Sequence, residues 1–341
     1  MTRRDLISHS TLGAGVLGGV LSNTASGAQA QPPRLKVGLY SITYLGVWYR
    51  GDALTLEQVI ERAKKYGYQG VEIDGKRPHG NPLDMPKRRC TELRKKAAGE
   101  GLEIYAVSAN NDFSSPIPEH RQTQLVYLRE LIRMTADLGA KPLRVFLGWP
   151  GVTKLPQGGG RYDIAQKVWK AEHEDFSEAE IWDWCRQCLI ESARYAREAG
   201  VTLALQNHAP VIKDYPDVLR MVREVDSPNL KVCLDAPLLR QKDEASIRKA
   251  AQEVGALQVL SHFGGEYETA PDGAVKGAPF YAPFVKAMIE IGYSGYIGYE
   301  LCHPLPVVGG QTVGLEFADN NARLAAEFMR GVIAAALRER S

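Results

Sequence analysis

Short apolar runs alternate along the chain with longer amphipathic segments. The apolar runs are rich in β-branched residues and predict strands, at residues 35–40, 70–73, 102–108, 143–147, 202–206, 230–234, 257–262 and 296–300. Segments with apolar residues three or four positions apart follow these runs and predict helices, at about 56–66, 87–99, 119–138, 178–199, 216–225, 244–254, 283–291 and 319–338. Glycines after most of these segments are typical helix stops. The pattern is thus a strand and then a helix, repeated eight times.

Eight β-then-α units predict a single (β/α)8 TIM barrel over residues 31–341, as one domain. An open, doubly wound sheet would more typically carry a glycine-rich phosphate loop after its first strand, and the turn at 41–44 (Ser-Ile-Thr-Tyr) has none. The longest insertion, residues 148–177, falls in the fourth strand-to-helix loop. Because such loops overhang the mouth of a barrel, we expect it to act as a lid.

The first 30 residues predict an export signal rather than a part of the fold. Arg3 and Arg4 stand in the stretch Thr-Arg-Arg-Asp-Leu-Ile at positions 2–7, which resembles a twin-arginine signal. A mildly apolar, glycine-rich stretch follows, and then Ala28-Gln29-Ala30, an A-x-A cleavage site. We therefore expect residues 1–30 to be a signal peptide and the mature protein to be periplasmic or otherwise extracytoplasmic.

The amino-acid composition argues against several classes of protein and of binding partner. The 341 residues include 42 Lys and Arg and 40 Asp and Glu, and removal of residues 1–30 leaves 40 and 39, a formal charge of +1. A chain this close to neutral gives no electrostatic reason to bind nucleic acid. After position 30 the sequence has no run that is long and apolar enough to span a membrane. Five scattered cysteines do not form the framework of a small disulfide-rich domain.

Polar and ionisable residues stand at the carboxyl ends of the predicted strands. In a barrel these ends form one mouth, where functional residues gather. The second strand ends at Glu72 and the third runs into Asn110. Four consecutive later strands each end with one potential metal ligand, namely Gln206, Asp235, His262 and Glu300. We predict that these four side chains meet at one site.

This ordered set resembles the xylose isomerase-like barrels called sugar phosphate isomerases/epimerases. The resemblance covers essentially the whole chain after residue 30 and rests on four stretches: Leu-Ala-Leu-Gln-Asn-His at 203–208, Val-Cys-Leu-Asp at 232–235, Leu-Ser-His at 260–262 and Ile-Gly-Tyr-Glu at 297–300. By this resemblance Asp235, His262 and Glu300 are ligands of one divalent metal ion, and the expected activity is isomerisation or epimerisation of a sugar.

Gln206 departs from the family, which usually has a glutamate there that binds the metal and, in the epimerases, also transfers a proton. The amide oxygen of Gln206 can still bind a hard cation, but an amide cannot accept and return a proton near neutral pH. The four ligands together carry two negative charges, which balance a divalent ion. Oxygen-rich ligation with one imidazole favours Mn²⁺ and also suits Mg²⁺, and Co²⁺ or Zn²⁺ stay open.

His208 is a candidate for the missing base. It lies two residues after Gln206, so both side chains point to the same side of the strand, and a free histidine titrates near neutral pH. The alternative is a histidine that only hydrogen-bonds a loop. We expect Glu300 and His208 to be catalytic. We expect three further residues to contact the substrate, namely Glu72, Asn110 and Trp149, although Glu72 could instead cap a helix.

The expected reaction is a metal-dependent isomerisation or epimerisation of an unphosphorylated sugar or sugar derivative through an enolate or ene-diolate. The loops after the last two strands contain no cluster of Lys or Arg that would bind a phosphate group, so the expected substrate is unphosphorylated. The alternative is a lyase or dehydratase that carries out β-elimination on a keto-sugar or 3-keto-glycoside, which Gln206 favours because this reaction needs one main base. The presence of Asp235, His262 and Glu300 together argues against a third hypothesis, a non-catalytic sugar-binding barrel.

Apurinic-site endonucleases of the same superfamily use several metal ions and a basic groove, and seven histidines with a near-neutral charge argue against that activity. The expected partner is therefore a small carbohydrate, without nucleic acid and, after signal removal, without a membrane. The pattern is compatible with a homo-oligomer.

Overall fold

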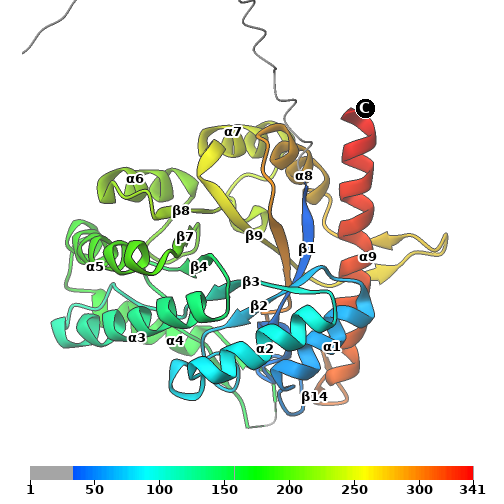
Figure 1. Ribbon diagram of the computed structural model, residues 1–341, viewed down its shortest axis with the longest axis horizontal. Helices are drawn as coiled ribbons and strands as arrows, with labels where there is room; N and C mark the ends of the chain where they lie inside the picture. The colour runs from blue at the N-terminus through cyan, green and yellow to red at the C-terminus, as the bar shows by residue number, and fades with distance from the viewer. Residues whose placement is uncertain (1–33, 157, 341) are drawn as a thin grey trace, which may run out of the picture. The chain divides into compact units, whose positions relative to one another are not determined.

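The eight expected strands form one closed, parallel barrel in the computed structural model, which describes residues 34–156 and 158–340 (Figure 1). The strands are β1 (Lys36–Tyr40), β2 (Gly70–Asp74), β3 (Glu103–Ser108), β4 (Pro142–Val145), β7 (Thr202–Gln206), β8 (Leu230–Cys233), β9 (Gln258–Gly264) and β12 (Tyr296–Glu300). Their order around the barrel is β1-β12-β9-β8-β7-β4-β3-β2, and β1 closes the sheet by pairing in parallel with both β12 and β2. The predicted barrel is confirmed.

In the part of the chain that the structure describes, eight long helices lie around this barrel (Figure 1). They are α1 (Leu56–Tyr66), α2 (Lys87–Gly99), α3 (Pro118–Asp137), α5 (Glu178–Ala199), α6 (Tyr215–Val225), α7 (Glu244–Val254), α8 (Tyr281–Glu290) and α9 (Leu315–Arg340). Local sequence sets their ends. Thr55 and Ser177 each begin a helix with a reciprocal capping box, and Gly67 and Gly200 end the same two helices in the left-handed conformation. Four 3-10 turns complete the frame, at Ser41–Tyr44, Pro82–Asp84, Ala236–Leu238 and Gly255–Leu257.

Two stacked tyrosines fill part of the interior of the barrel. The rings of Tyr105 on β3 and Tyr296 on β12 lie 3.9 Å apart and nearly parallel. The stack fits because glycines face it: a Cβ on Gly38 or Gly298 would come within 2.3 or 2.4 Å of Tyr105 atoms. The cysteines are all free, and Cys185 and Cys188 belong to the core cluster, as their helical spacing predicts.

Three small additions decorate the barrel. The insertion predicted as a lid contains a hairpin of β5 (Thr153–Lys154) and β6 (Gly160–Arg161), followed by helix α4 (Asp163–His173). Two further hairpins pair β10 (Glu268–Thr269) with β11 (Val275–Lys276) and β13 (Val307–Val308) with β14 (Gln311–Thr312). The sequence interpretation did not include these elements. Two-residue strands are too short to show a period, and α4 buries one residue, His173.

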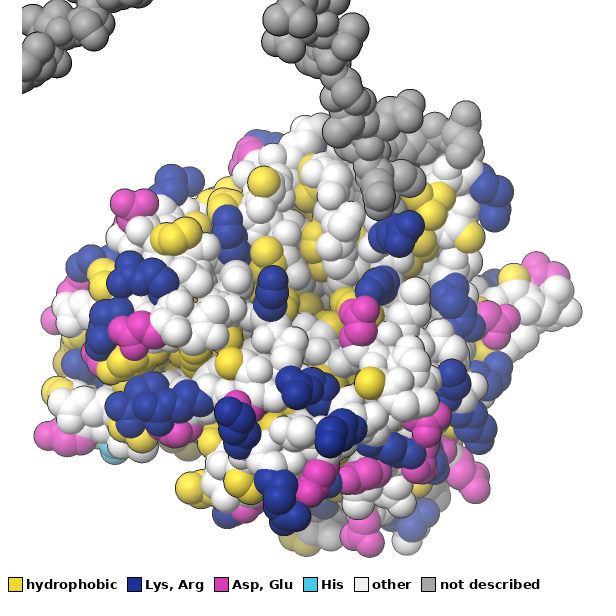
Figure 2. All heavy atoms as spheres, in the orientation of Figure 1, with side chains coloured by type: hydrophobic (Ala, Val, Ile, Leu, Met, Phe, Trp, Pro, Cys, Tyr) yellow, Lys and Arg dark blue, Asp and Glu magenta, His cyan; other side chains and the backbone are white. Residues whose placement is uncertain are grey.

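The surface carries mixed charge. On the face shown in Figure 2, Lys and Arg side chains are interspersed with Asp and Glu side chains. Within the described residues, no helix is both long and apolar enough to cross a lipid bilayer. The expected signal peptide, residues 1–30, lies outside the part of the chain that the structure describes.

Candidate active site at the mouth of the barrel

A cleft of about 430 Å³ opens where the strands end. Its polar lining includes Asn110, Arg144, Gln206, His208 and Glu300, which come from strands β4, β7 and β12 and from the loops after β3 and β7. Its apolar lining consists mainly of aromatic rings, those of Phe146, Trp149, Tyr162, Phe280 and Tyr281. A volume of this size and a few polar groups among apolar walls are typical of a small-molecule site.

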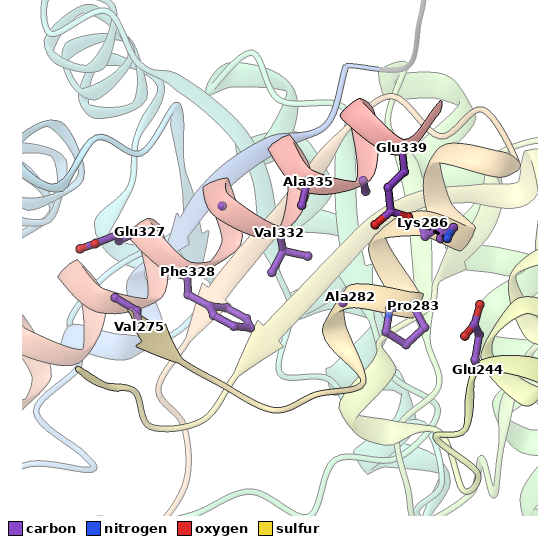
Figure 3. A pocket seen from close by; sticks show the side chains of 12 residues that line it. Glu244, Val275, Ala282, Pro283, Lys286, Glu327, Phe328, Val332, Ala335 and Glu339 are labelled. Carbon is purple, nitrogen blue, oxygen red and sulfur yellow. Dashed lines mark hydrogen bonds and ion pairs between the residues drawn. The ribbon is translucent and has the colours of Figure 1, made fainter. Parts of the chain in front are cut away.

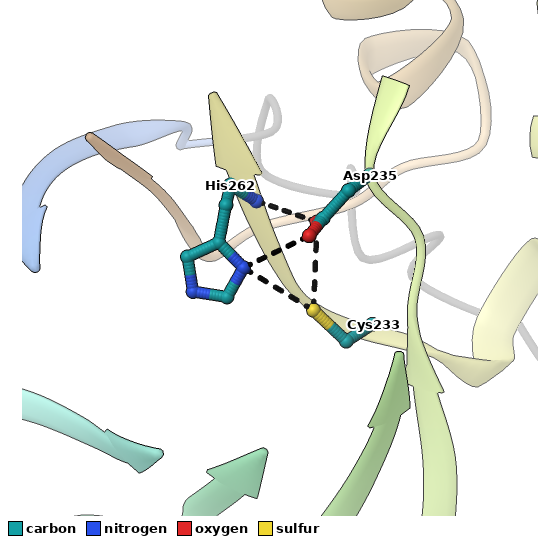
Figure 4. Close-up of side chains that lie close together, drawn as sticks. All are labelled: Cys233, Asp235 and His262. Atoms are coloured by element: carbon teal, nitrogen blue, oxygen red, sulfur yellow. Dashed lines mark hydrogen bonds and ion pairs between the residues drawn. The ribbon is translucent and has the colours of Figure 1, made fainter. Parts of the chain in front are cut away.

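Asp235 and His262 form a buried pair beneath the cleft lining (Figure 4). Nδ1 of His262 lies 3.1 Å from Oδ2 of Asp235, and the backbone N–H of His262 donates to Oδ1 of Asp235 at 2.6 Å. Sγ of Cys233 lies 3.5 Å from both side chains. These three residues could together hold a metal ion. The sequence interpretation missed Cys233, although its position two residues before Asp235 places it on the same side of the strand.

Glu72 contacts the imidazole nitrogen of His262 that does not face Asp235, and Glu72 does not line the cleft. Its Oε2 lies 2.9 Å from Nε2 of His262, its Oε1 accepts a hydrogen bond from Ser108, and its side chain is fully buried. Burial opposes charge, but the positive imidazole holds the pKa of Glu72 and of Asp235 below their usual values. The two carboxylates in turn raise the pKa of His262 well above its usual value, against the effect of burial. We therefore assign Glu72 to orientation of His262 instead of direct substrate contact.

The Asp235–His262 pair fits a cation. Since the pKa of His262 is raised, a proton lies between Nδ1 of His262 and Oδ2 of Asp235, which are 3.1 Å apart. When that proton leaves and Glu72 still accepts from Nε2, the lone pair on Nδ1 faces Oδ2 of Asp235. Two facing acceptors repel each other unless a proton or a metal ion lies between them. A carboxylate that holds the far nitrogen of a histidine is also a common support for metal-bound histidines. Asp235 and His262 are therefore the residues best placed to hold a divalent ion.

Arg144 is a site residue that the sequence interpretation missed. Its guanidinium is buried, donates to the hydroxyl of Tyr40 at 2.9 Å and to Oε1 of Gln206 at 3.4 Å, and lies 3.8 Å from Oε2 of Glu300. Burial alone would lower the pKa of Arg144, but Tyr40 and Glu300 help to raise it, so the side chain stays charged. The site therefore contains a fixed positive charge of its own.

Gln206 links Arg144 to Asp235. Its Oε1 accepts from Arg144, and its Nε2 donates to Oδ2 of Asp235. Glu300 lines the cleft and is paired with Arg144, and burial raises the pKa of its carboxyl group. Of the four predicted ligands, the structure thus joins three in one hydrogen-bonded chain and places the fourth beside Arg144. Their role as ligands stays a prediction.

His208 stands among aromatic rings at the cleft wall. Its ring lies 5.0 Å from Phe146 and 5.1 Å from Trp149, edge-on to both, and its Nδ1 donates to the carbonyl of Ala209 at 2.5 Å. Desolvation lowers the pKa of His208 to about 4. The imidazole is therefore neutral at physiological pH, and its lone pair is on Nε2.

Asn110 and Trp149 line the cleft as expected of substrate contacts. Asn110 donates to Oδ1 of Asp74 at 3.0 Å and accepts from Lys76 at 3.2 Å, which fixes its amide. Asp74 also accepts from the hydroxyl of Tyr40 at 2.6 Å, so the network continues to Arg144. Trp149 stacks on Phe146 with ring centroids 5.0 Å apart.

A separate groove of about 560 Å³ lies outside the barrel mouth, between α8 and α9 (Figure 3). Phe328 and Val332 of α9 and Pro283 of α8 form apolar walls, and Lys286 pairs with Glu339 at 2.8 Å on its rim. Its lining contains none of the strand-end residues described above. The barrel mouth is therefore the better candidate for chemistry.

Curated proteins with similar sequences include two sugar enzymes. Over 185 residues the chain is 29% identical to xylose isomerase from Thermus thermophilus, a match that covers 49% of this chain and 42% of that protein. The chain thus spans less than half the length of that relative. Over 259 residues it is 23% identical to fructoselysine 3-epimerase from Escherichia coli O157:H7, a match that covers 73% of this chain and 86% of that protein.

Solved structures share the fold at low identity. D-psicose 3-epimerase from Clostridium cellulolyticum H10 superposes with a TM-score of 0.64 at 20% identity, covering 87% of this chain and 99% of that one. A 3-keto-D-glucoside 4-epimerase from E. coli superposes with a TM-score of 0.63 at 17% identity, covering 87% of this chain and 100% of that one. The family model described as xylose isomerase-like TIM barrel matches residues 60–331. The chain therefore belongs to the xylose isomerase-like TIM barrel family.

Proposed function

We propose that this protein is a metal-dependent isomerase or epimerase of an unphosphorylated sugar or sugar derivative. The observation that carries the proposal is the buried Asp235–His262 pair, which could hold a cation. Gln206 joins this pair to a cleft of about 430 Å³, a volume that suits a sugar. Fructoselysine 3-epimerase and xylose isomerase among the relatives support the same class of reaction. An oxygen-rich ligand set with one imidazole supports Mn²⁺ or Mg²⁺ as the ion.

The cleft lining supports a neutral substrate. Sugars bind through hydroxyl groups and through the apolar faces of their rings, and the lining offers amides from Asn110 and Gln206 beside several aromatic rings. Arg144, the one Lys or Arg in this lining, is already paired with Glu300 and Gln206. A phosphate group would need more unpaired N–H donors than this lining supplies.

We assign the proton transfers to Glu300 and His208. A bound divalent ion would polarise a substrate carbonyl and its neighbouring hydroxyl group, which makes the adjacent carbon more acidic. The carboxylate of Glu300 lines the cleft and removes a proton from that carbon. Nε2 of neutral His208, with Nδ1 held by Ala209, is the second group that can accept a proton and return it. Arg144 supplies positive charge beside Glu300 as negative charge develops on the substrate.

One observation favours a lyase as the second candidate. Both ends of the Gln206 amide are engaged, by Arg144 and Asp235, and Glu300 is the single carboxylate in the cleft lining. Elimination of a β-substituent from a keto-sugar or 3-keto-glycoside needs one main base and an acid for the leaving group. Glu300 can remove the proton and then return it to the leaving group, so that one carboxylate serves as base and then as acid.

The test combines metal analysis with isotope exchange. We expect Mn²⁺-loaded mature protein to exchange a carbon-bound proton for deuterium in D₂O with a keto-sugar from a panel of free ketoses and 3-keto-glycosides, followed by NMR. Epimer formation identifies an epimerase, and release of a β-substituent identifies a lyase. Absence of both exchange and elimination across the panel would overturn the proposal.

We also propose that residues 1–30 direct twin-arginine export to an extracytoplasmic compartment, which rests on the sequence alone. The twin-arginine route carries folded proteins. A metal ion that is bound in the cytoplasm before export would therefore reach the compartment with the protein.

A further inference from the structure

A second pocket of about 200 Å³, called the outer lobe below, adjoins the cleft, which is called the main lobe. Four residues line both lobes, namely Trp149, Tyr162, Gln166 and His208. Beyond them the outer lobe is lined by Trp169 of α4 and by Pro150 and Pro210, from the loops after β4 and β7. The two lobes are therefore neighbouring compartments with common walls, and Trp149 stands at the boundary.

The outer lobe is built from flat apolar surfaces. Trp149, Tyr162 and Trp169 supply rings and two prolines supply further apolar walls, while Gln166 and the neutral His208 supply hydrogen-bonding groups. Its lining contains no Lys, Arg, Asp or Glu. This chemistry suits an uncharged ring with an apolar face, and it offers no partner to a phosphate or a carboxylate.

The walls are held in place before any ligand binds. Nε1 of Trp169 donates to Oγ of Ser114 at 2.8 Å, and its ring stacks on His173 with centroids 4.0 Å apart. Trp149 stacks on Phe146, and Tyr162 meets Trp149 edge-on at 6.0 Å. A wall that is already ordered loses little side-chain entropy on binding, so it can add affinity.

We propose that the substrate is a two-ring molecule: a glycoside whose reacting sugar lies in the main lobe and whose second ring lies in the outer lobe. The second ring is an uncharged group with an apolar face, either another pyranose or an aryl aglycone. This inference rests on the proposed sugar chemistry of the main lobe and adds the substrate class. Trp149, Tyr162 and Trp169 then select glycosides over free monosaccharides.

Calorimetric binding to the Mn²⁺-loaded mature protein tests the inference. The one-ring probes are D-fructose and methyl β-D-glucopyranoside, and the two-ring probes are cellobiose and phenyl β-D-glucopyranoside. We expect at least one two-ring probe to bind about tenfold or more tightly than the one-ring probes, because it also covers the aromatic walls. Preference for cellobiose identifies a second pyranose, and preference for the phenyl glycoside identifies an aryl group.

Gln166→Trp provides the matched structural test. Gln166 is exposed on α4 and faces both lobes, so a larger side chain there fills the outer lobe without entering the core. We expect it to reduce the ratio of two-ring to one-ring affinity about tenfold, towards one. Lys167→Trp, also exposed on α4 but outside both linings, serves as control and should keep the wild-type ratio.

Equal affinity for one-ring and two-ring probes in the wild type would overturn the two-ring substrate, as would an unchanged ratio in Gln166→Trp. Failure of the proposed function has a different signature, namely no deuterium exchange and no elimination with any keto-sugar. Exchange with free ketoses together with equal binding of all probes would leave an isomerase without an outer subsite.

Discussion

At the scale of single residues, the hydrogen bond between Arg144 and Gln206 engages the amide oxygen that is predicted to bind a metal ion. Gln206 directs its oxygen to Arg144 and its N–H to Asp235. To bind an ion held by Asp235 and His262, the amide must turn its oxygen towards that ion. The turn would point the amide N–H groups at the guanidinium, donor against donor. Arg144 and a metal ion therefore compete for the same oxygen.

Arg144→Met is expected to bind Mn²⁺ more tightly than the wild type, by about tenfold or more, because it removes a fixed positive charge a few ångströms from the ligands. Calorimetric titration of metal-free protein measures the change. Arg144→Lys keeps the charge and should stay nearer to the wild type. Equal affinities in Arg144→Met and the wild type would show that the guanidinium does not oppose the ion.

Asp235→Ala and His262→Ala are each expected to lose the bound ion, from about one per mature chain, because each removes a ligand from a small set. Elemental analysis after expression with Mn²⁺ measures the stoichiometry. Cys233→Ala tests the third member of the cluster. Burial raises the pKa of its thiol, so we expect Cys233 to stay protonated and this variant to retain the ion. A wild type without metal would contradict the site assignment.

Gln206→Glu should bind metal at least as tightly as the wild type, since it adds a negative charge facing the ion, and should not raise native turnover. His208→Ala should lose about 10²–10⁴-fold in turnover, the usual contribution of a general acid or base. Steady-state rates on the substrate found by isotope exchange compare the two variants. An unimpaired His208→Ala in a fast epimerase would assign the second proton transfer to a different group.

At the scale of elements, the strands of the barrel close around the Tyr105–Tyr296 stack, and this requires glycine on neighbouring strands. A Cβ at Gly298 of β12 would lie 2.4 Å from the hydroxyl of Tyr105 and 3.3 Å from Cδ2 of His262. The strand that carries Glu300 therefore also sets the space in which His262 is held.

Gly298→Ala is expected to lower the free energy of unfolding by about 1–3 kcal/mol, because the core must move to admit one methyl group. Gly331→Ala on α9 is the matched control: its Cβ would meet no atom within 4 Å. Alanine also favours a helix over glycine by about 1 kcal/mol, so this variant should be slightly more stable. Urea unfolding measures both. Equal stability of Gly298→Ala and the wild type would mean that the tyrosine stack shifts freely.

At the scale of the whole molecule, we predict that residues 1–30 are an export signal that is removed from the mature protein. Replacement of Arg3 and Arg4 by lysine should leave the precursor in the cytoplasm, since the proposed twin-arginine signal would be recognised through this pair. Fractionation and immunoblotting measure export, and N-terminal sequencing of the exported protein should find a start near Gln31. Export of the Lys-Lys precursor at the wild-type rate would contradict the twin-arginine assignment.

The sequence by itself determined the eight strands and the eight surrounding helices of the barrel, and it predicted the end at which the site lies. Helices α1, α2, α5 and α7 and strands β7 and β12 have the predicted bounds, because periods of 3.6 and 2 and the capping residues are local signals. Parallel strands in a barrel place all carboxyl ends at one mouth. This rule brought Gln206, Asp235 and His262 together in the prediction, and they form one hydrogen-bonded chain in the structure.

Only the tertiary structure decided what surrounds these residues. Arg144 meets Gln206 across 62 positions of sequence, and Glu72 meets His262 across 190. Such contacts leave no periodic trace in the chain, and Arg144, in the middle of a short strand, could equally have faced outwards. The role of Glu72, the buried guanidinium and the outer lobe all depend on which side chains the closed barrel brings within a few ångströms of one another.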